Sequence, residues 1–225
     1  MRFHLGAFPE SKNFDPESGG WSALPDVSLD AISRRALRAS MGLFLLWSLL
    51  FLLVFPLELL TPQAIQLSDN VIQIQLPIFQ IIDWPILVNL IVILILFIPT
   101  HELIHALCCP AWGLSTDTTF GVWLPKGFIY IHHDGPMSRD RFLLVLVAPY
   151  IALSLFPLAL IAISKTASWP TESTISLTWL SLLGSLLAGG DFVSLISLLS
   201  SKLPSTALIR NTGQKSYWKS IDKTS

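Results

Sequence analysis

Two histidines and a glutamate stand at a spacing that suits metal chemistry, in His101-Glu102-Leu103-Ile104-His105. On a helix, residues i and i+4 share one face, so His101 and His105 would lie one turn apart. Glu102 would lie about 100° further round the helix, beside the pair but not aligned with it. This H-E-x-x-H pattern is typical of zinc hydrolases, in which both histidines bind the metal and the glutamate is the general base. It therefore predicts zinc on His101 and His105, with Glu102 as the catalytic base.

The same motif lies near the end of an apolar run, Trp84–Cys109, that is long enough to cross a bilayer. Ionisable side chains within a span are costly and usually serve a function. The position therefore narrows the prediction from a zinc hydrolase to an intramembrane metallopeptidase.

The elements that must carry this site are predicted to be membrane helices. Of the 225 residues, 52% are hydrophobic and only 13% are charged, whereas soluble domains have about 25% charged residues. Segments near Met41–Leu60, Trp84–Cys109, Phe142–Ile163 and Ile175–Ser200 have the length of a span, roughly 20 residues. The expected fold class is therefore an all-α integral membrane protein with about four transmembrane helices and a short β-hairpin in a cytosolic loop.

Basic residues set the predicted orientation of these spans. They precede the first span, fall between the second and third, and follow the fourth, whereas the loop 61–83 has none. The positive-inside rule then puts both termini and the loop 110–141 in the cytosol. We expect a cytosolic arm over residues 1–39, a membrane peptidase domain over 40–201 and a loosely ordered basic tail over 202–225. The polar start of the chain carries no cleavable signal peptide pattern, so the first span is expected to stay as an anchor.

A third zinc ligand must come from another span at the same depth, because catalytic zinc uses three protein ligands and keeps one position open. His101 lies 8 residues before Cys109, and Asp191 lies 9 residues before Ser200. Both are therefore about 12–14 Å below the cytosolic surface. Small residues at 181, 184 and 188 share the face of Asp191 and would allow close helix contact. Asp191 is the predicted third ligand.

The cytosolic loop is predicted to form a hairpin from Thr118–Leu124 and Gly127–His133, which are rich in β-branched and aromatic residues. Its edge could hold an unwound peptide by strand addition. His132 and His133 are interpreted as solvated loop residues rather than metal ligands. A further short strand is expected at 71–76, where apolar and polar residues alternate.

On these residues the chain resembles the zincin-like membrane metallopeptidases, a family first described as a domain of unknown function and distantly similar to the site-2 proteases. The resemblance covers roughly residues 85–200 and is carried by three pieces: His101–His105, Ser138-Arg139-Asp140-Arg141-Phe142 leading to Ala148-Pro149, and Gly189-Gly190-Asp191. It implies zinc on His101 and His105, with Glu102 as base. Asp191 matches the place of the aspartate that site-2 proteases supply from a later span, although those enzymes typically have an Asp-Gly order.

The resulting expectation is a Zn²⁺-dependent endopeptidase that cuts membrane-anchored proteins or peptides near the cytosolic face of the bilayer. The alternative is a non-catalytic metal-binding membrane scaffold or a metal carrier. A net charge of −1 gives no argument for nucleic acid, and the adjacent pair Cys108-Cys109 gives no disulfide framework. Nothing in the sequence indicates an oligomeric state.

Overall fold

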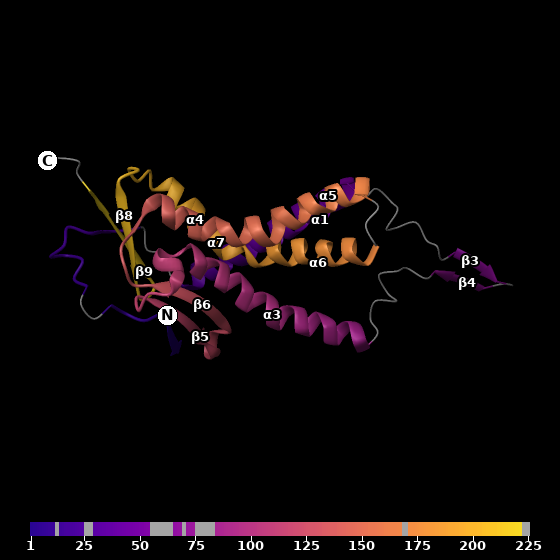
Figure 1. The fold of residues 1–225 in the computed structure, drawn as a ribbon, viewed down its shortest axis with the longest axis horizontal. Helices are drawn as coiled ribbons and strands as arrows, with labels where there is room; N and C mark the ends of the chain where they lie inside the picture. Colours follow the sequence, from indigo (N-terminus) through magenta and orange to yellow (C-terminus); the bar gives the residue numbers. More distant parts are fainter. Residues whose placement is uncertain are drawn as a thin grey trace.

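The chain folds into an elongated molecule with helices in the middle, two β-sheets at one end and a separate β-hairpin at the other (Figure 1). A computed structural model describes residues 1–11, 14–24, 29–54, 65–68, 71–74, 84–167 and 171–221. The helices are α1 (Leu29–Val54), α3 (Trp84–Cys108), α4 (Arg139–Tyr150), the π-helical turn η3 (Ile151–Leu155), α5 (Phe156–Ala167), α6 (Thr171–Leu187) and α7 (Gly189–Ser200), with short 3₁₀ turns η1 (Pro110–Gly113) and η2 (Leu124–Lys126).

The described strands form two sheets and a separate hairpin. Sheet A has the order β1-β5-β6, with β1 (Arg2–Leu5) parallel to β5 (Thr118–Trp123) and β6 (Phe128–His133) antiparallel to it. Sheet B has the order β2-β9-β8-β7, built from β2 (Ser22–Ala23), β9 (Lys215–Ser220), β8 (Ala207–Thr212) and β7 (Met137–Ser138). The hairpin β3–β4 (Ile65–Ser68 and Val71–Ile74) lies at the far end of the helices (Figure 1).

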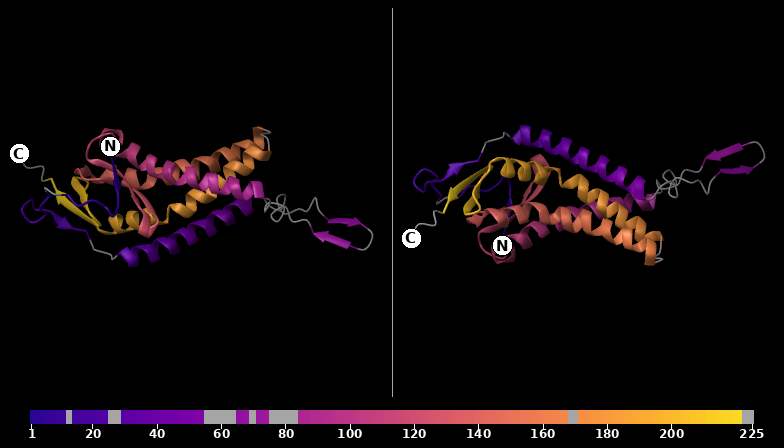
Figure 2. Two further views of the ribbon diagram at one scale, coloured as in Figure 1. Left: turned by 90° about the horizontal axis from the view of Figure 1, so that it is seen from below. Right: turned by 90° about the horizontal axis from the view of Figure 1, so that it is seen from above.

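The predicted all-α fold class is therefore wrong, because the molecule is mixed α/β. The predicted hairpin is confirmed as β5–β6, but it belongs to a larger sheet. The amino-terminal arm adds β1 to that sheet and β2 to sheet B, and the tail expected to be loosely ordered forms the β8–β9 hairpin. Figure 2 shows these strands gathered beside one end of the helices. Two of the four strands of sheet B, β2 and β7, have only two residues, which is too short to show a periodic pattern.

The expectation of four membrane-spanning helices is also wrong for the described residues. One continuous helical run, Arg139–Ile163, is long and apolar enough to cross a membrane. A second is possible only if Leu177–Leu187 and Gly189–Ser200, bent by 50° at their junction, count as one span, and the apolar helix Ile95–Cys108 is shorter than a span. The predicted segments Met41–Leu60 and Trp84–Cys109 extend partly outside the residues whose side chains are described.

Close contacts between helices hold α6 and α7 in place. A Cβ at Gly184 of α6 would lie 2.6 Å from the Leu153 carbonyl oxygen of η3, so only glycine allows this approach. The Ser181 hydroxyl, one turn earlier, donates to the Ser154 carbonyl oxygen at 2.7 Å. These contacts confirm the predicted close approach along the small-residue face. At the β-rich end, a core of Leu146, Leu198 and residues of β8 ties α4 and α7 to sheet B.

Candidate metal centre

The two motif histidines converge on Asp191, although 90 residues separate His101 from that aspartate. His101 Nε2 lies 3.1 Å from Asp191 Oδ2, and His105 Nε2 lies 3.4 Å from Asp191 Oδ1. Both histidines are buried, and the Asp191 side chain is 18% exposed. The structure thus brings together the three residues that the sequence predicts as ligands. Metal binding itself stays a prediction.

The spacing of these donor atoms fits a tetrahedral metal ion. Two donors that each lie 2.0–2.1 Å from zinc in tetrahedral geometry are about 3.3 Å apart. Each histidine Nε2 lies at about this separation from one carboxylate oxygen, 3.1 Å from Oδ2 for His101 and 3.4 Å from Oδ1 for His105. Two imidazole nitrogens and a carboxylate are also a donor set that zinc accepts. The residues present therefore fit the ion.

The second ring nitrogen of His105 is fixed by a backbone carbonyl. His105 Nδ1 lies 2.7 Å from the buried Val145 oxygen of α4. Only a protonated Nδ1 can donate to a carbonyl, so Nε2, which lies beside the Asp191 carboxylate, is the nitrogen of His105 that is available to a metal ion. The corresponding Nδ1 of His101 is buried without a hydrogen-bond partner among the described residues.

Glu102 lies beside this cluster and touches the hairpin. One ligand atom from each of His101, Glu102 and His105 lies within 4.8 Å of the others. Glu102 Oε2 accepts a hydrogen bond from the Ile131 amide of β6 at 3.1 Å. Asp191, which contacts both Nε2 atoms, stays the predicted third ligand. Glu102 instead lies beside β6, an edge strand of sheet A, a position that suits the predicted base.

The motif Ser138-Arg139-Asp140-Arg141 anchors the ends of two helices. The Ser138 hydroxyl caps α4 by accepting from the Arg141 amide at 3.3 Å. The Arg141 guanidinium donates to the Cys108 and Cys109 carbonyl oxygens at 3.0 and 3.3 Å. Those carbonyls end α3, where a cation also complements the helix dipole. The motif therefore fixes the helix that carries His105.

The position of Asp191 depends on a glycine before it. Helix α6 ends at Leu187 and α7 begins at Gly189, with a bend of 50° between them. A Cβ at Gly189 would fall on the Ser40 side chain and the Ala36 carbonyl of α1. Close packing of α7 on α1 therefore requires glycine here, two residues from the carboxylate.

His132 and His133 are not the solvated residues that we expected, since each is only 4% exposed. Burial lowers the pKa of His132 to about 4 and also lowers the pKa of His133. His133 Nδ1 lies 2.9 Å from the Thr118 hydroxyl, whereas His132 Nε2 has no partner among the described residues. Sequence reasoning missed this because the arm that packs near His132, through Phe8, is distant in the chain.

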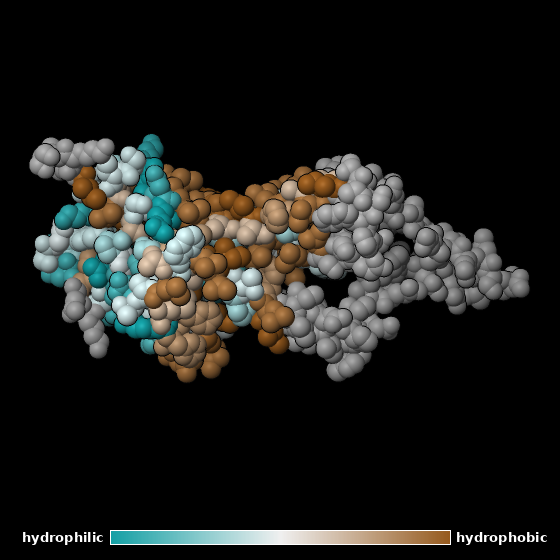
Figure 3. Space-filling model, in the orientation of Figure 1, coloured by the Kyte–Doolittle hydropathy of each residue, from teal (hydrophilic) through white to brown (hydrophobic). Residues whose placement is uncertain are grey.

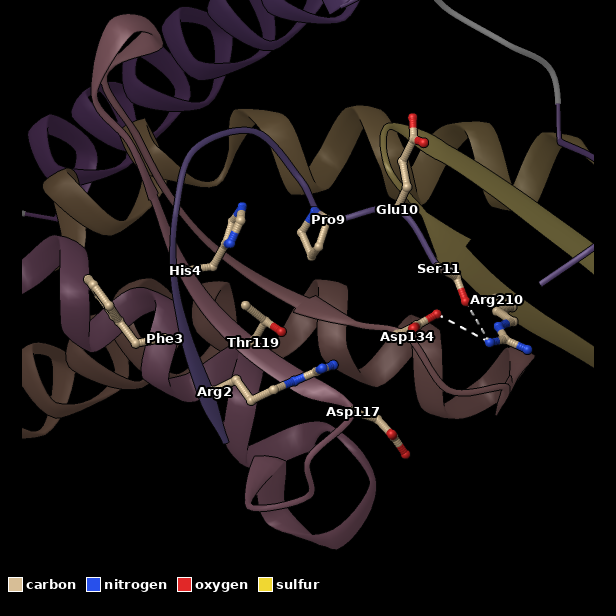
Figure 4. A pocket seen from close by; sticks show the side chains of 10 residues that line it. All are labelled: Arg2, Phe3, His4, Pro9, Glu10, Ser11, Asp117, Thr119, Asp134 and Arg210. Carbon is tan, nitrogen blue, oxygen red and sulfur yellow. Dashed lines mark hydrogen bonds and ion pairs between the residues drawn. The ribbon is translucent and has the colours of Figure 1, made fainter. Parts of the chain in front are cut away.

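A cavity of about 540 Å³ lies beside sheet A, away from the histidine cluster. Figure 4 shows it between β1, the following arm, β5 and Arg210 of β8, which bonds Asp134 at 3.2 Å. Neither motif histidine nor Asp191 lines it. The polar cavity is therefore distinct from the metal centre.

Sequence reasoning also missed three contacts made to the site by other parts of the chain: the Val145 carbonyl, the Ile131 amide and the Arg141 guanidinium. Two of these are backbone groups, and the identity of a residue does not show which contacts its backbone makes. Proline at position 149 was the available signal for the first, and the Ser138–Arg141 motif for the third.

Comparison with known proteins adds a family. A family model described as "Putative zincin peptidase" matches residues 94–206, half of the chain. The matched region contains His101, Glu102, His105 and Asp191. No curated protein and no solved structure matches the chain significantly.

Proposed function

Because this chain belongs to the family described as putative zincin peptidases, we propose that it is a zinc-dependent endopeptidase that cuts membrane-anchored proteins near the cytosolic face of a membrane. The observation that carries the proposal is the convergence of His101 Nε2 and His105 Nε2 on the Asp191 carboxylate, with Glu102 adjacent.

His101, His105 and Asp191 would hold the ion, and Glu102 would move the proton. Bound zinc supplies Lewis acidity, which polarises a carbonyl and makes water more acidic. Glu102 takes a proton from the water that adds to the scissile carbonyl carbon, then gives it to the leaving amine as the C–N bond breaks. The hydrogen bond from the Ile131 amide occupies Oε2, so Oε1 is the oxygen available for that proton.

The outer edge of β6 is the proposed binding place for the substrate backbone. Since the Ile131 amide points to Glu102 and not to β5, the alternation of an antiparallel ladder directs the backbone groups of Ile129 and His133 the same way. An extended peptide could pair with this edge. A substrate carbonyl that took the Ile131 N–H would also release Glu102 Oε2.

Membrane association is supported by the surface of the helices. Leucines and isoleucines there are widely exposed, including Leu45 at 61%, Ile95 at 64% and Leu199 at 59%. Figure 3 shows hydrophobic side chains over the helical half and hydrophilic ones at the end that carries sheet B. Such apolar area is unusual for a soluble monomer. We propose that the helical half is embedded in the bilayer and that both termini lie on the cytosolic side.

Metal analysis and cleavage assays on the purified protein test the proposal. Wild type should bind one zinc per chain, His101→Ala and Asp191→Ala should lose it, and Glu102→Gln should keep it. Glu102→Gln should also cleave a membrane-anchored reporter on the order of 100-fold more slowly or less. If Asp191→Ala binds zinc as wild type does, Asp191 is not the third ligand. If Glu102→Gln keeps full activity, Glu102 is not the catalytic base.

Substitutions at one position test the edge strand. Ile131→Pro removes the amide that faces Glu102, whereas Ile131→Ala removes most of the side chain and keeps the amide. The proline variant should keep zinc and lose cleavage, and the alanine variant should retain most activity. Equal cleavage by both variants would show that the β6 edge does not bind substrate.

A further inference from the structure

The carbonyl that orients His105 is one that a regular helix would already use. Val145 lies inside α4, and its oxygen would normally accept a hydrogen bond from the amide four residues later. That residue is Pro149, which has no N–H. We propose that Pro149 is a positioning residue of the metal centre: by leaving the Val145 carbonyl without its helical donor, it makes that oxygen available to His105 Nδ1.

The surroundings of Pro149 argue against a role in ending the helix. The helical run continues from Arg139 through η3 to Ile163, and Pro149 is fully buried within it. A π-helical turn, Ile151–Leu155, follows directly. Single π-helical turns inside α-helices occur frequently at functional sites. The helix therefore continues past a residue that destabilises it, at the point where its carbonyl meets His105.

The contact between these two atoms is short and dry. The distance of 2.7 Å from His105 Nδ1 to the Val145 oxygen is that of a strong hydrogen bond, and both atoms are buried. A buried carbonyl without a donor is unfavourable. Pro149 and His105 thus satisfy one another's requirements: the proline frees an acceptor, and the imidazole supplies the missing donor.

This inference rests on the proposed zinc site and concerns how that site is prepared. With Nδ1–H committed to Val145, Nε2 is the nitrogen left to bind the metal, and it lies 3.4 Å from Asp191 Oδ1. Loss of such an orienting partner typically weakens metal affinity 10- to 100-fold. Pro149→Ala would add a competing amide and draw the Val145 carbonyl back toward the helix axis. We expect zinc affinity to fall roughly 10-fold, the lower end of that range, because a carbonyl oxygen can accept two hydrogen bonds.

Pro157 provides a matched control. It is also fully buried, and it lies in the same helical run. The carbonyl four residues before it is that of Leu153, which lies against Gly184 of α6 rather than against a histidine. Pro157→Ala therefore restores a helical amide without touching the metal centre.

The experiment measures zinc affinity by chelator competition, together with the unfolding midpoint of the metal-free protein, for wild type, Pro149→Ala, Pro149→Gly and Pro157→Ala. We expect both Pro149 variants to bind zinc roughly 10-fold more weakly, Pro157→Ala to bind as wild type, and metal-free Pro149→Ala to unfold no earlier than wild type. Unchanged affinity in the Pro149 variants would overturn the inference while leaving the zinc site intact. Loss of folded metal-free protein in both would also overturn it, by assigning Pro149 a packing role. Wild type that binds no zinc would instead refute the proposed function.

Discussion

Alanine substitutions at the two adjacent glycines before Asp191 should change the stability of the protein in opposite directions. Both lie in α7 with ordinary helical backbone, since neither has a positive φ. A Cβ at Gly189 would meet the Ser40 amide nitrogen at 2.6 Å, along with the Ser40 hydroxyl and the Ala36 carbonyl, whereas no neighbouring atom of the described residues lies within 4 Å of a Cβ at Gly190. Backbone atoms of α1 cannot move aside separately, so Gly189→Ala must push α1 and α7 apart.

The magnitudes follow from two effects. Replacing a helical glycine with alanine stabilises by roughly 0.5–1 kcal/mol at either position. Overpacking at Gly189 costs about 1–3 kcal/mol. Gly190→Ala should therefore stabilise by roughly 0.5–1 kcal/mol, and Gly189→Ala, whose packing cost is larger than this gain, should destabilise by up to about 2.5 kcal/mol. The difference between the two variants isolates the packing cost, because the helix preference cancels.

Denaturant unfolding in a mild detergent, followed by tryptophan fluorescence, measures both variants against wild type. Zinc affinity is the second measurement, since a shift of α7 moves Asp191 away from the histidines. Gly189→Ala should weaken zinc binding, and Gly190→Ala should change it much less. Equal stability of the two variants, or a more stable Gly189→Ala, would refute the close α1–α7 packing and with it the account of how Asp191 is placed.

Three further changes test contacts around the site. Arg141→Ala should lower the free energy of unfolding by about 1 kcal/mol, because Arg141 is exposed and its two hydrogen bonds to the end of α3 are screened; the exposed Arg34→Ala is the control, and equal effects would contradict the capping role. Tyr130→Phe removes the hydroxyl that donates to the arm at 2.9 and 3.1 Å, so amide hydrogen exchange of β1 should quicken, while unchanged exchange would show that the arm is held by other contacts. His132 has a pKa lowered to about 4 by burial, so the unfolded chain binds the proton more tightly. Its contribution to stability is complete above about pH 6.5 and is lost as pH falls toward 4, by about 2 kcal/mol at pH 5; His132→Gln should flatten that part of the stability profile, and an unchanged slope would contradict the burial.

The sequence predicted the residues of the candidate site better than the fold that surrounds them. The i, i+4 spacing of His101 and His105 is set by one helix, so it survives any arrangement of the other elements. Asp191 was selected by depth along two helices, and the structure does bring it to the histidines. Its metal ligation stays a prediction. The β5–β6 hairpin is confirmed because its two strands are neighbours in the chain.

The rest of the fold depended on contacts between distant segments. Sheet B joins Ser22–Ala23, Met137–Ser138 and the carboxy-terminal hairpin. Two of these strands have two residues each, too short for alternation to be visible. Composition directed attention to the apolar helices, and the polar arm and tail were predicted as cytosolic segments without strands, the tail loosely ordered. A polar segment with low local preference can still become a strand when a neighbouring edge offers hydrogen bonds.

Irregular helix geometry gathers around the metal centre and relates its residues to one another. Pro99 stands two residues before His101, Pro149 stands four residues after Val145, and Gly189-Gly190 precede Asp191. Each of these helix-disfavoured residues lies within four positions of a predicted ligand or of the group that orients one. Helix preference alone disfavours all of them, but Gly189 has a packing reason, which is its close contact with α1. Sites that break a local rule without a packing reason are where function is expected. It follows that Pro149→Ala should separate stability from zinc affinity, whereas Gly189→Ala should lower both. Gly190, where no neighbouring atom of the described residues would contact an added Cβ, should show the smallest loss of affinity.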